Sequence, residues 1–172
     1  LLWIGLMAVP QHANSASPKP QSSTNKLAEL SQPANQDLEP VKKPVALCST
    51  TQIADFTRQI VGEDWEVLCV LGPGQDPHTY EVGNDDLLAV KRADLCFHNG
   101  WNLEGHDWMR SLAKNAGKPL ITCTTLVAPL NVEDSHGVQD VKDPHAWFDV
   151  ARASIYVQNI LRGIQQADPG QA

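Results

Sequence analysis

The feature that most constrains the fold is an alternation of short apolar runs with segments of helical periodicity, which begins at residue 45. Four apolar runs have the length of strands, and each precedes, directly or after a loop, a segment with apolar residues at helical spacing. The runs are 45–50, 66–71, 94–98 and 119–125, and the helical segments are 51–62, 84–93, 103–117 and about 149–167. This order predicts an α/β fold with a parallel four-stranded sheet and right-handed crossovers. Because the runs are almost continuously apolar, we expect helices on both faces of the sheet.

The chain divides into four segments by composition. Residues 1–16 contain the apolar run LLWIGLMAV and a small-residue zone, which predicts a secretory signal peptide with a clipped start; a disordered apolar tail is the alternative. The run is too short to span a bilayer, and no cysteine precedes residue 41 as an acceptor for a lipid anchor. Residues 17–44, rich in Ser, Pro and Gln, predict a flexible linker. We expect residues 45–148 to form the α/β lobe and residues 149–172 a further helix, in a protein exported to the periplasm.

The composition argues against several kinds of function. The formal net charge is −7 and no stretch is dense in Lys and Arg, so nucleic-acid binding is not expected. The chain also lacks the GxGxxG, GxxxxGK[ST], GxSxG and HExxH motifs that mark many enzymes. No pair of cysteines has the CxxC spacing, which argues against a cysteine zinc site.

The four cysteines all lie inside apolar, strand-like runs. They are Cys48, Cys69, Cys96 and Cys123. Export would permit disulfides, but cysteine is also a common buried small hydrophobe. Buried free thiols are the slightly favoured prediction, because strands rarely bring two such side chains together.

The tripeptide Asp-Pro-His occurs twice, as DPHTYE at 76–81 and as DPHAWF at 143–148. His78 follows the second apolar run and His145 follows the fourth, and ligands of open α/β sheets bind beyond the carboxyl ends of the strands. Proline stiffens the backbone before each histidine, and the preceding aspartate is placed to accept a hydrogen bond from the ring or from loop amides. A single loop histidine is more often a surface residue. Two with matched neighbours at one sheet edge predict a metal site.

Two imidazoles do not complete a coordination shell, because zinc requires four ligands and manganese prefers more oxygen. Three carboxylates are further candidates, and spacing does not choose among them: Glu81, Glu104 and Asp149. Tyr80 and Trp147 are expected to wall the site and exclude water. The other histidines are weaker candidates: His98 near the same edge, His106 on a solvated helix face, His136 in a surface loop or as an entry-route ligand, and His12 in the leader.

The region from Val45 to Pro169 resembles the extracytoplasmic metal-binding proteins of manganese, zinc and iron ABC transporters, also called zinc-uptake or adhesin-like solute-binding proteins. The resemblance implies that His78 and His145 are metal ligands. It also implies two α/β lobes joined by a long, rigid helix, with two more ligands, commonly a Glu or His and an Asp, in the second lobe. The motifs that carry it are, in order, TTQIADFTRQIVG (50–62), LGPGQDPHTYE (71–81), ADLCFHNGWNLEG (93–105) and DPHAWFD (143–149).

This sequence departs from the family pattern at three places. It stops at Ala172, where the family continues into the bridging helix and the second lobe, so we expect a fragment without the remaining ligands. Asp149-Val150 stands where the family usually has Asp-Pro. The stretch 131–143 is short and has one histidine, whereas zinc-specific members often carry a long His-rich loop. This difference favours a manganese or broad-specificity member.

The function that the resemblance implies is capture rather than catalysis. The protein would bind Mn²⁺, Zn²⁺ or Fe²⁺ as a transported solute outside the cytoplasmic membrane and deliver it to an ABC transporter permease; we expect a monomer. An apolar patch is expected where the second lobe would pack. A small exported metallohydrolase is the alternative, with Asp76 or Glu81 as the general base. An adhesin-like interaction module is the third possibility.

Overall fold

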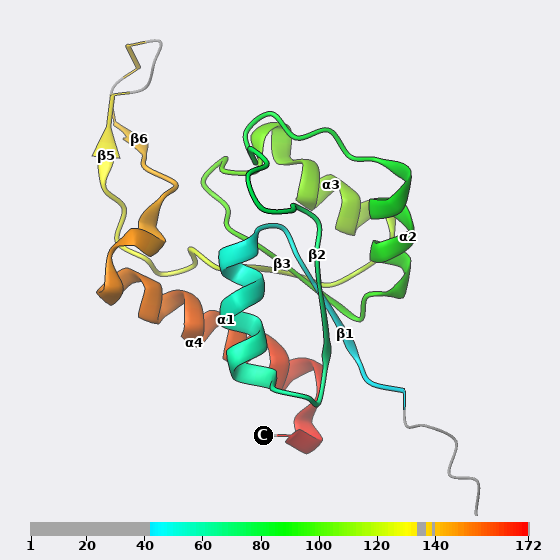
Figure 1. Ribbon diagram of the computed structural model, residues 1–172. Coiled ribbons are helices and arrows are strands. Elements are labelled where there is room, and N and C mark those ends of the chain that lie inside the picture. Colours follow the sequence, from blue (N-terminus) through cyan, green and yellow to red (C-terminus); the bar gives the residue numbers. More distant parts are fainter. Residues whose placement is uncertain (1–41, 134–136, 139, 172) are drawn as a thin grey trace, which may run out of the picture. The chain divides into compact units, whose positions relative to one another are not determined.

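The centre of the fold is a parallel four-stranded sheet in the order β2-β1-β3-β4 (Figure 1). The computed structural model describes residues 42–133, 137, 138 and 140–171. The predicted α/β fold with a four-stranded parallel sheet is confirmed, and the carboxyl ends of its strands lie at one edge. The strands are β1 (Val45–Cys48), β2 (Glu66–Cys69), β3 (Leu95–His98) and β4 (Leu120–Thr122).

Helices cover both faces of the sheet, because successive side chains of each strand point to opposite faces. Ala46 and Cys48 of β1 belong to the core between the sheet and helices α1 and α4. Leu47, between them, belongs to the core under α2 and α3. Figure 1 shows the two helix pairs on opposite sides of the strands. The helices are α1 (Thr51–Val61), α2 (Asn84–Arg92), α3 (Trp108–Asn115) and α4 (Val150–Ala167).

The third helix begins later than the sequence pattern predicts. A helix over 103–117 is expected, but α3 begins at Trp108 and a separate 3-10 turn, η1 (Gly105–Asp107), precedes it. Gly105 lies directly against the backbone of His78, where a Cβ would overlap the His78 carbonyl oxygen. The predicted start is therefore wrong, because this segment closes on the His78 loop before it turns into a helix. Four non-glycine residues around the turn have positive φ: Trp101, Asn102, His106 and Asp107.

The loop before the second Asp-Pro-His contains a short hairpin that the sequence pattern does not predict. Strands β5 (Asn131–Val132) and β6 (Val141–Lys142) pair in antiparallel register. Two further 3-10 turns, η2 (Ala146–Phe148) and η3 (Pro169–Gln171), flank α4.

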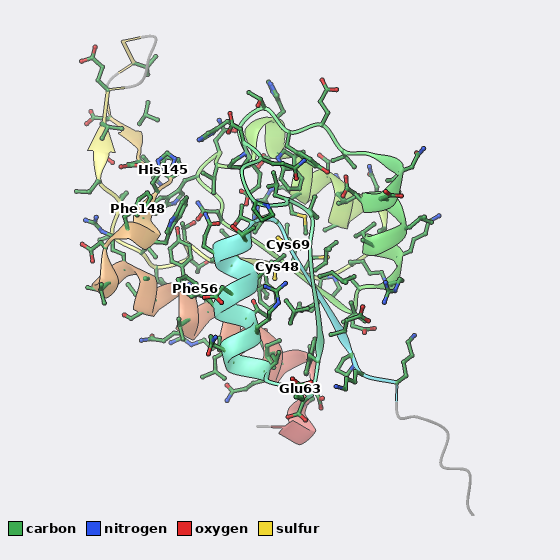
Figure 2. All side chains as sticks on the ribbon, viewed as in Figure 1. Cys48, Phe56, Glu63, Cys69, His145 and Phe148 are labelled. Atoms are coloured by element: carbon green, nitrogen blue, oxygen red, sulfur yellow. The ribbon has the colours of Figure 1, made fainter. Side chains whose placement is uncertain are left out.

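Leu130 and Phe148 line a surface depression beside His145, and Phe148 is 80% exposed (Figure 2).

All four cysteines are free thiols, as the sequence predicts. Cys48 and Cys69 are register partners on β1 and β2 and remain unbonded (Figure 2). Burial raises the pKa of the Cys48 thiol to about 12 and that of Cys69 to about 11. Unreactive, protonated thiols are the result.

The described residues include little of the N-terminal region. The predicted signal peptide (1–16) and most of the predicted linker (17–44) lie outside them, so these boundaries stay predictions. Residues 42–44 are described and precede β1 without helix or strand. Within the described part of the chain, no helix combines the length and apolar character needed to cross a membrane.

Candidate metal centre

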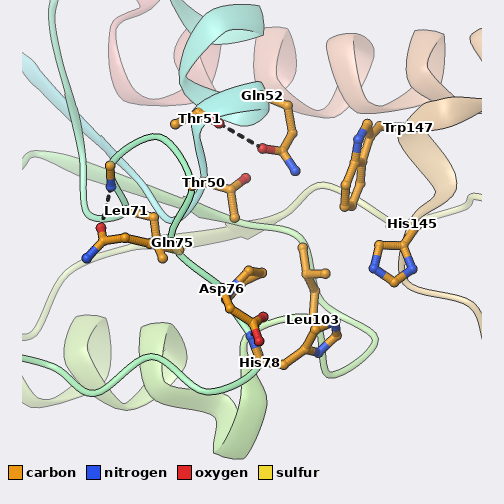
Figure 3. Close-up of a pocket in the computed structure, with 13 residues that line it drawn as sticks. Thr50, Thr51, Gln52, Leu71, Gln75, Asp76, His78, Leu103, His145 and Trp147 are labelled. Carbon is orange, nitrogen blue, oxygen red and sulfur yellow. Dashed lines mark hydrogen bonds between the residues drawn. The ribbon is translucent and has the colours of Figure 1, made fainter.

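The structure brings the two Asp-Pro-His loops together. His78 lies in the loop between β2 and α2, and His145 lies between β6 and α4. Their ring centroids are 5.6 Å apart and the ring planes form an angle of 63°. Figure 3 shows the two rings as neighbours at one side of a pocket. Residues 67 positions apart in the chain thus reach one site, because parallel strands end at the same edge.

Each aspartate folds its loop in the same way. Oδ1 of Asp76 accepts the backbone N–H of His78 at 2.9 Å, and Oδ1 of Asp143 accepts the backbone N–H of His145 at 3.0 Å. Such Asp side-chain turns fix the backbone two residues onward. Asp76 also accepts the hydroxyl of Thr79 at 3.2 Å. The repeated Asp is therefore part of a repeated local structure.

Asp143 additionally sets the proton position on the His145 ring. Its Oδ1 lies 2.8 Å from Nδ1 of His145. The backbone N–H of His145, and then its ring, hold the pKa of Asp143 below its usual value, so this carboxylate is ionised and can only accept. In its neutral form the His145 ring therefore has its proton on Nδ1, facing Asp143, and the Nε2 lone pair free for a ligand.

The pocket that both rings line has a volume of about 200 Å³. Trp147 forms one wall, with its ring centroid 5.4 Å from that of His145, as the sequence predicts. Tyr80 does not line the pocket, and that prediction is wrong: its ring packs on Trp108 and its hydroxyl donates to Asp86. The start of α1 forms the far wall (Figure 3). The lining residues are Thr50, Thr51, Gln52, Leu71, Gly72, Gly74, Gln75, Asp76, Pro77, His78, Leu103, His145 and Trp147.

None of the three candidate carboxylates lines this pocket. Glu104 is 1% exposed, and its carboxylate accepts hydrogen bonds from Ser49 Oγ and two backbone amides. Asp149 caps α4 by accepting two backbone N–H groups. Glu81 is exposed and outside the pocket. Among the described residues, no three His, Cys, Asp or Glu side chains are grouped to hold a metal ion, so the histidine pair stands alone.

The remaining histidines lie outside the pocket or outside the described residues. His98 is buried at the end of β3, where its Nε2 is 2.8 Å from Thr122 Oγ1 and its Nδ1 is 3.7 Å from Glu104. Burial lowers the pKa of His98, so its ring is neutral. His106 is exposed but lies on the η1 turn rather than on the predicted helix face. His136 is not among the described residues.

Comparison with known proteins gives consistent similarities. The family model described as "Zinc-uptake complex component A periplasmic" matches residues 47–172. The metal ABC transporter substrate-binding lipoprotein SloC of Streptococcus mutans is 33% identical over 134 residues, which are 74% of this chain and 44% of that protein. The manganese ABC transporter substrate-binding lipoprotein PsaA of Streptococcus pneumoniae is 35% identical over 68% of this chain and 39% of its own length.

A solved structure has the same fold over the matched region. It is the Mn-bound periplasmic metal binding protein from Candidatus Liberibacter asiaticus, with a TM-score of 0.67 and 31% identity over 76% of this chain and 48% of that one. The present chain thus spans less than half the length of the relatives it matches. These relatives are named as solute-binding proteins and not as enzymes.

Proposed function

The chain belongs to the family of periplasmic zinc-uptake components, the ZnuA family, and on this premise we propose that it contributes the two-histidine half of a divalent metal site in an ABC transporter substrate-binding protein. The ion is the transported solute and not a resident cofactor. Relatives are named as manganese components, and the short 131–143 stretch has one histidine. Mn²⁺ is therefore the proposed solute, with Zn²⁺ and Fe²⁺ as competing ions.

The single observation that carries this proposal is the pairing of the His78 and His145 rings in the wall of one pocket. The ring centroids are 5.6 Å apart, which lets one ion between them be approached by both imidazoles. Asp143 holds the His145 proton on Nδ1 at 2.8 Å and so presents Nε2 as a ligand. Trp147 and Leu103 supply apolar walls that limit water around the ion.

The donor set within the described residues is half of a complete shell. Metal sites of this kind need at least four ligands, and the described residues offer a pair. We propose that the other ligands come from residues outside the described part.

The proposed partner follows from the family. Substrate-binding components present their solute to a permease in the cytoplasmic membrane, and we propose this partner for the whole protein, which would act outside that membrane as a monomer. The hydrolase alternative gains no support, because Asp76, the carboxylate that lines the pocket, is engaged by the His78 amide and Thr79. The adhesin-like alternative has no observation in its favour either.

Calorimetric titration of the chain with Zn²⁺ and Mn²⁺ tests the proposal. We expect His78→Ala and His145→Ala each to weaken binding by about tenfold or more, because each removes one of two ligands. His106→Ala is the matched control, since His106 is an exposed histidine outside the pocket. Equal affinity in all four proteins would rule out the shared site.

A further inference from the structure

Both histidine loops are attached to one segment of the chain, residues 99–108, which we call the clamp segment. It runs from the end of β3 to the first residue of α3. On one side, Trp108 Nε1 and the Gly105 backbone N–H donate to the carbonyl oxygen of Pro77, at 2.9 and 3.3 Å. On the other side, Asn99 Nδ2 donates to the carbonyl oxygen of Pro144 at 3.0 Å. In both loops the acceptor is the residue directly before the histidine.

With these contacts, both polar groups of each Pro–His peptide unit are hydrogen-bonded. The proline C=O and the histidine N–H belong to the same planar peptide group. In the first loop the clamp segment holds the C=O and Asp76 holds the N–H. In the second loop Asn99 holds the C=O and Asp143 holds the N–H. Each plane from which a histidine Cα projects is thereby fixed at both edges.

The clamp segment is itself rigidly held. The buried carboxylate of Glu104 accepts Ser49 Oγ at 2.6 Å, the Asn99 N–H at 2.8 Å and the Gly100 N–H at 3.1 Å. These bonds close the segment on itself and tie it to the end of β1. Gly105 packs against the His78 carbonyl so closely that no side chain fits between them. Both histidine loops are therefore hydrogen-bonded to the same rigid segment.

Asn99 has a single orientation available. It is fully buried, and its Nδ2 donates to Gly100 O at 2.9 Å as well as to Pro144 O. Its Oδ1 accepts the hydroxyl of Tyr156 from α4 at 2.7 Å. Rotating the amide would break all three bonds inside the core, where unsatisfied polar groups are costly.

We propose that Asn99 and Trp108 are positioning residues that set the separation of the His78 and His145 rings and, through it, metal affinity. This inference rests on the proposed function for its metal-binding consequence, whereas the ring separation itself is a property of the metal-free protein. Neither side chain lines the pocket. Both act through a proline carbonyl.

Two substitutions remove the side-chain hydrogen bonds to the proline carbonyls, and the chain offers a matched control for each. Trp108→Phe deletes the Nε1 donor and keeps an aromatic ring in the core. Its control is Trp65→Phe, because Trp65 is 4% exposed and its Nε1 has no hydrogen-bond partner in the part of the chain described. Asn99→Leu deletes the other donor. Its control is Asn159→Leu, since Asn159 is 6% exposed and donates to Cys123 O and Thr125 O, away from the pocket.

The test measures two quantities in the full chain. The first is the nuclear Overhauser effect between the His78 and His145 ring protons without metal, and the second is Zn²⁺ affinity by calorimetry. We expect Trp108→Phe and Asn99→Leu to weaken the nuclear Overhauser effect between the two rings, called the ring–ring effect below. Both should also lower Zn²⁺ affinity by about tenfold, which is the lower end of the losses found for residues that orient metal ligands. The control variants should keep both, although Asn159→Leu lowers the urea midpoint.

Ring–ring effects and Zn²⁺ affinities equal to those of the control variants would overturn the proposal. If Asn99→Leu does not fold, Trp108→Phe decides alone, because it retains the aromatic packing against Tyr80. The two proposals fail separately. Unchanged Zn²⁺ binding in His78→Ala and His145→Ala refutes the metal site, whereas an unchanged ring–ring effect in Trp108→Phe refutes positioning.

Discussion

Glu104→Gln tests the physical role that the structure gives to this buried carboxylate. Two donors, Ser49 Oγ and the Asn99 N–H, bind Oε1, and the Gly100 N–H binds Oε2 at 3.1 Å. Glutamine keeps the shape but has one oxygen. If that oxygen takes the Oε1 position, the amide NH₂ faces the buried Gly100 N–H, and one donor loses its acceptor. The expected loss in the free energy of unfolding is about 1–3 kcal/mol, a large part of a typical stability of about 5–15 kcal/mol.

Urea unfolding followed by tryptophan fluorescence measures this loss. The midpoint should fall while the slope of free energy against urea stays unchanged, because the exposed area on unfolding is the same. Glu81→Gln is the matched control, since Glu81 is exposed and the same chemical change there removes no hydrogen bond within the described part of the chain. An unfolding free energy of Glu104→Gln equal to that of Glu81→Gln would refute the assignment of a structural role to the second oxygen.

Two further perturbations have defined outcomes. Burial lowers the pKa of His98 below its ordinary value of 6.5. The unfolded chain therefore binds a proton at a higher pH than the native protein does, and the free energy of unfolding falls as the pH drops below 6.5. The variant His98→Gln should flatten this part of a plot of urea midpoint against pH, and an unchanged slope would contradict the argument. Asp149→Ala removes the acceptor of two α4 amides, at 2.8 and 3.1 Å, and should cost about 1 kcal/mol by urea unfolding. Asp55→Ala on α1 is its control, and equal losses in both would count against the cap.

Local patterns in the sequence predict most of the fold. The strand and helix positions follow from apolar runs and helical spacing, and β1, α1, β2, α2, β3 and β4 lie where these patterns place them. The pattern fails over 103–107, where a helix is predicted but the backbone adopts positive φ at His106 and Asp107. The spacing of apolar residues predicts which side chains are buried. It does not predict that Gly105 packs directly against the His78 backbone.

The candidate site shows the same division. Two Asp-Pro-His motifs at the ends of parallel strands are enough to predict that His78 and His145 meet, since topology alone brings strand ends together. Spacing could not tell that Glu104 is a structural acceptor and not a ligand. That role depends on Ser49, which is 55 positions away in the chain. The position of Tyr80 two residues after His78 likewise predicts a place in the pocket wall, but its ring packs on Trp108 instead.

By itself the sequence determined the parallel sheet, and it predicted the sheet edge and the two imidazoles of the proposed metal site. Each of these follows from residue order, because strand direction and side-chain alternation are local properties of the backbone. Only the tertiary structure decided how the imidazoles are held. The hydrogen bonds from Trp108 to Pro77 and from Asn99 to Pro144 join residues 31 and 45 positions apart. Such bonds form between groups that packing makes neighbours, and no local pattern encodes which carbonyl each donor will meet.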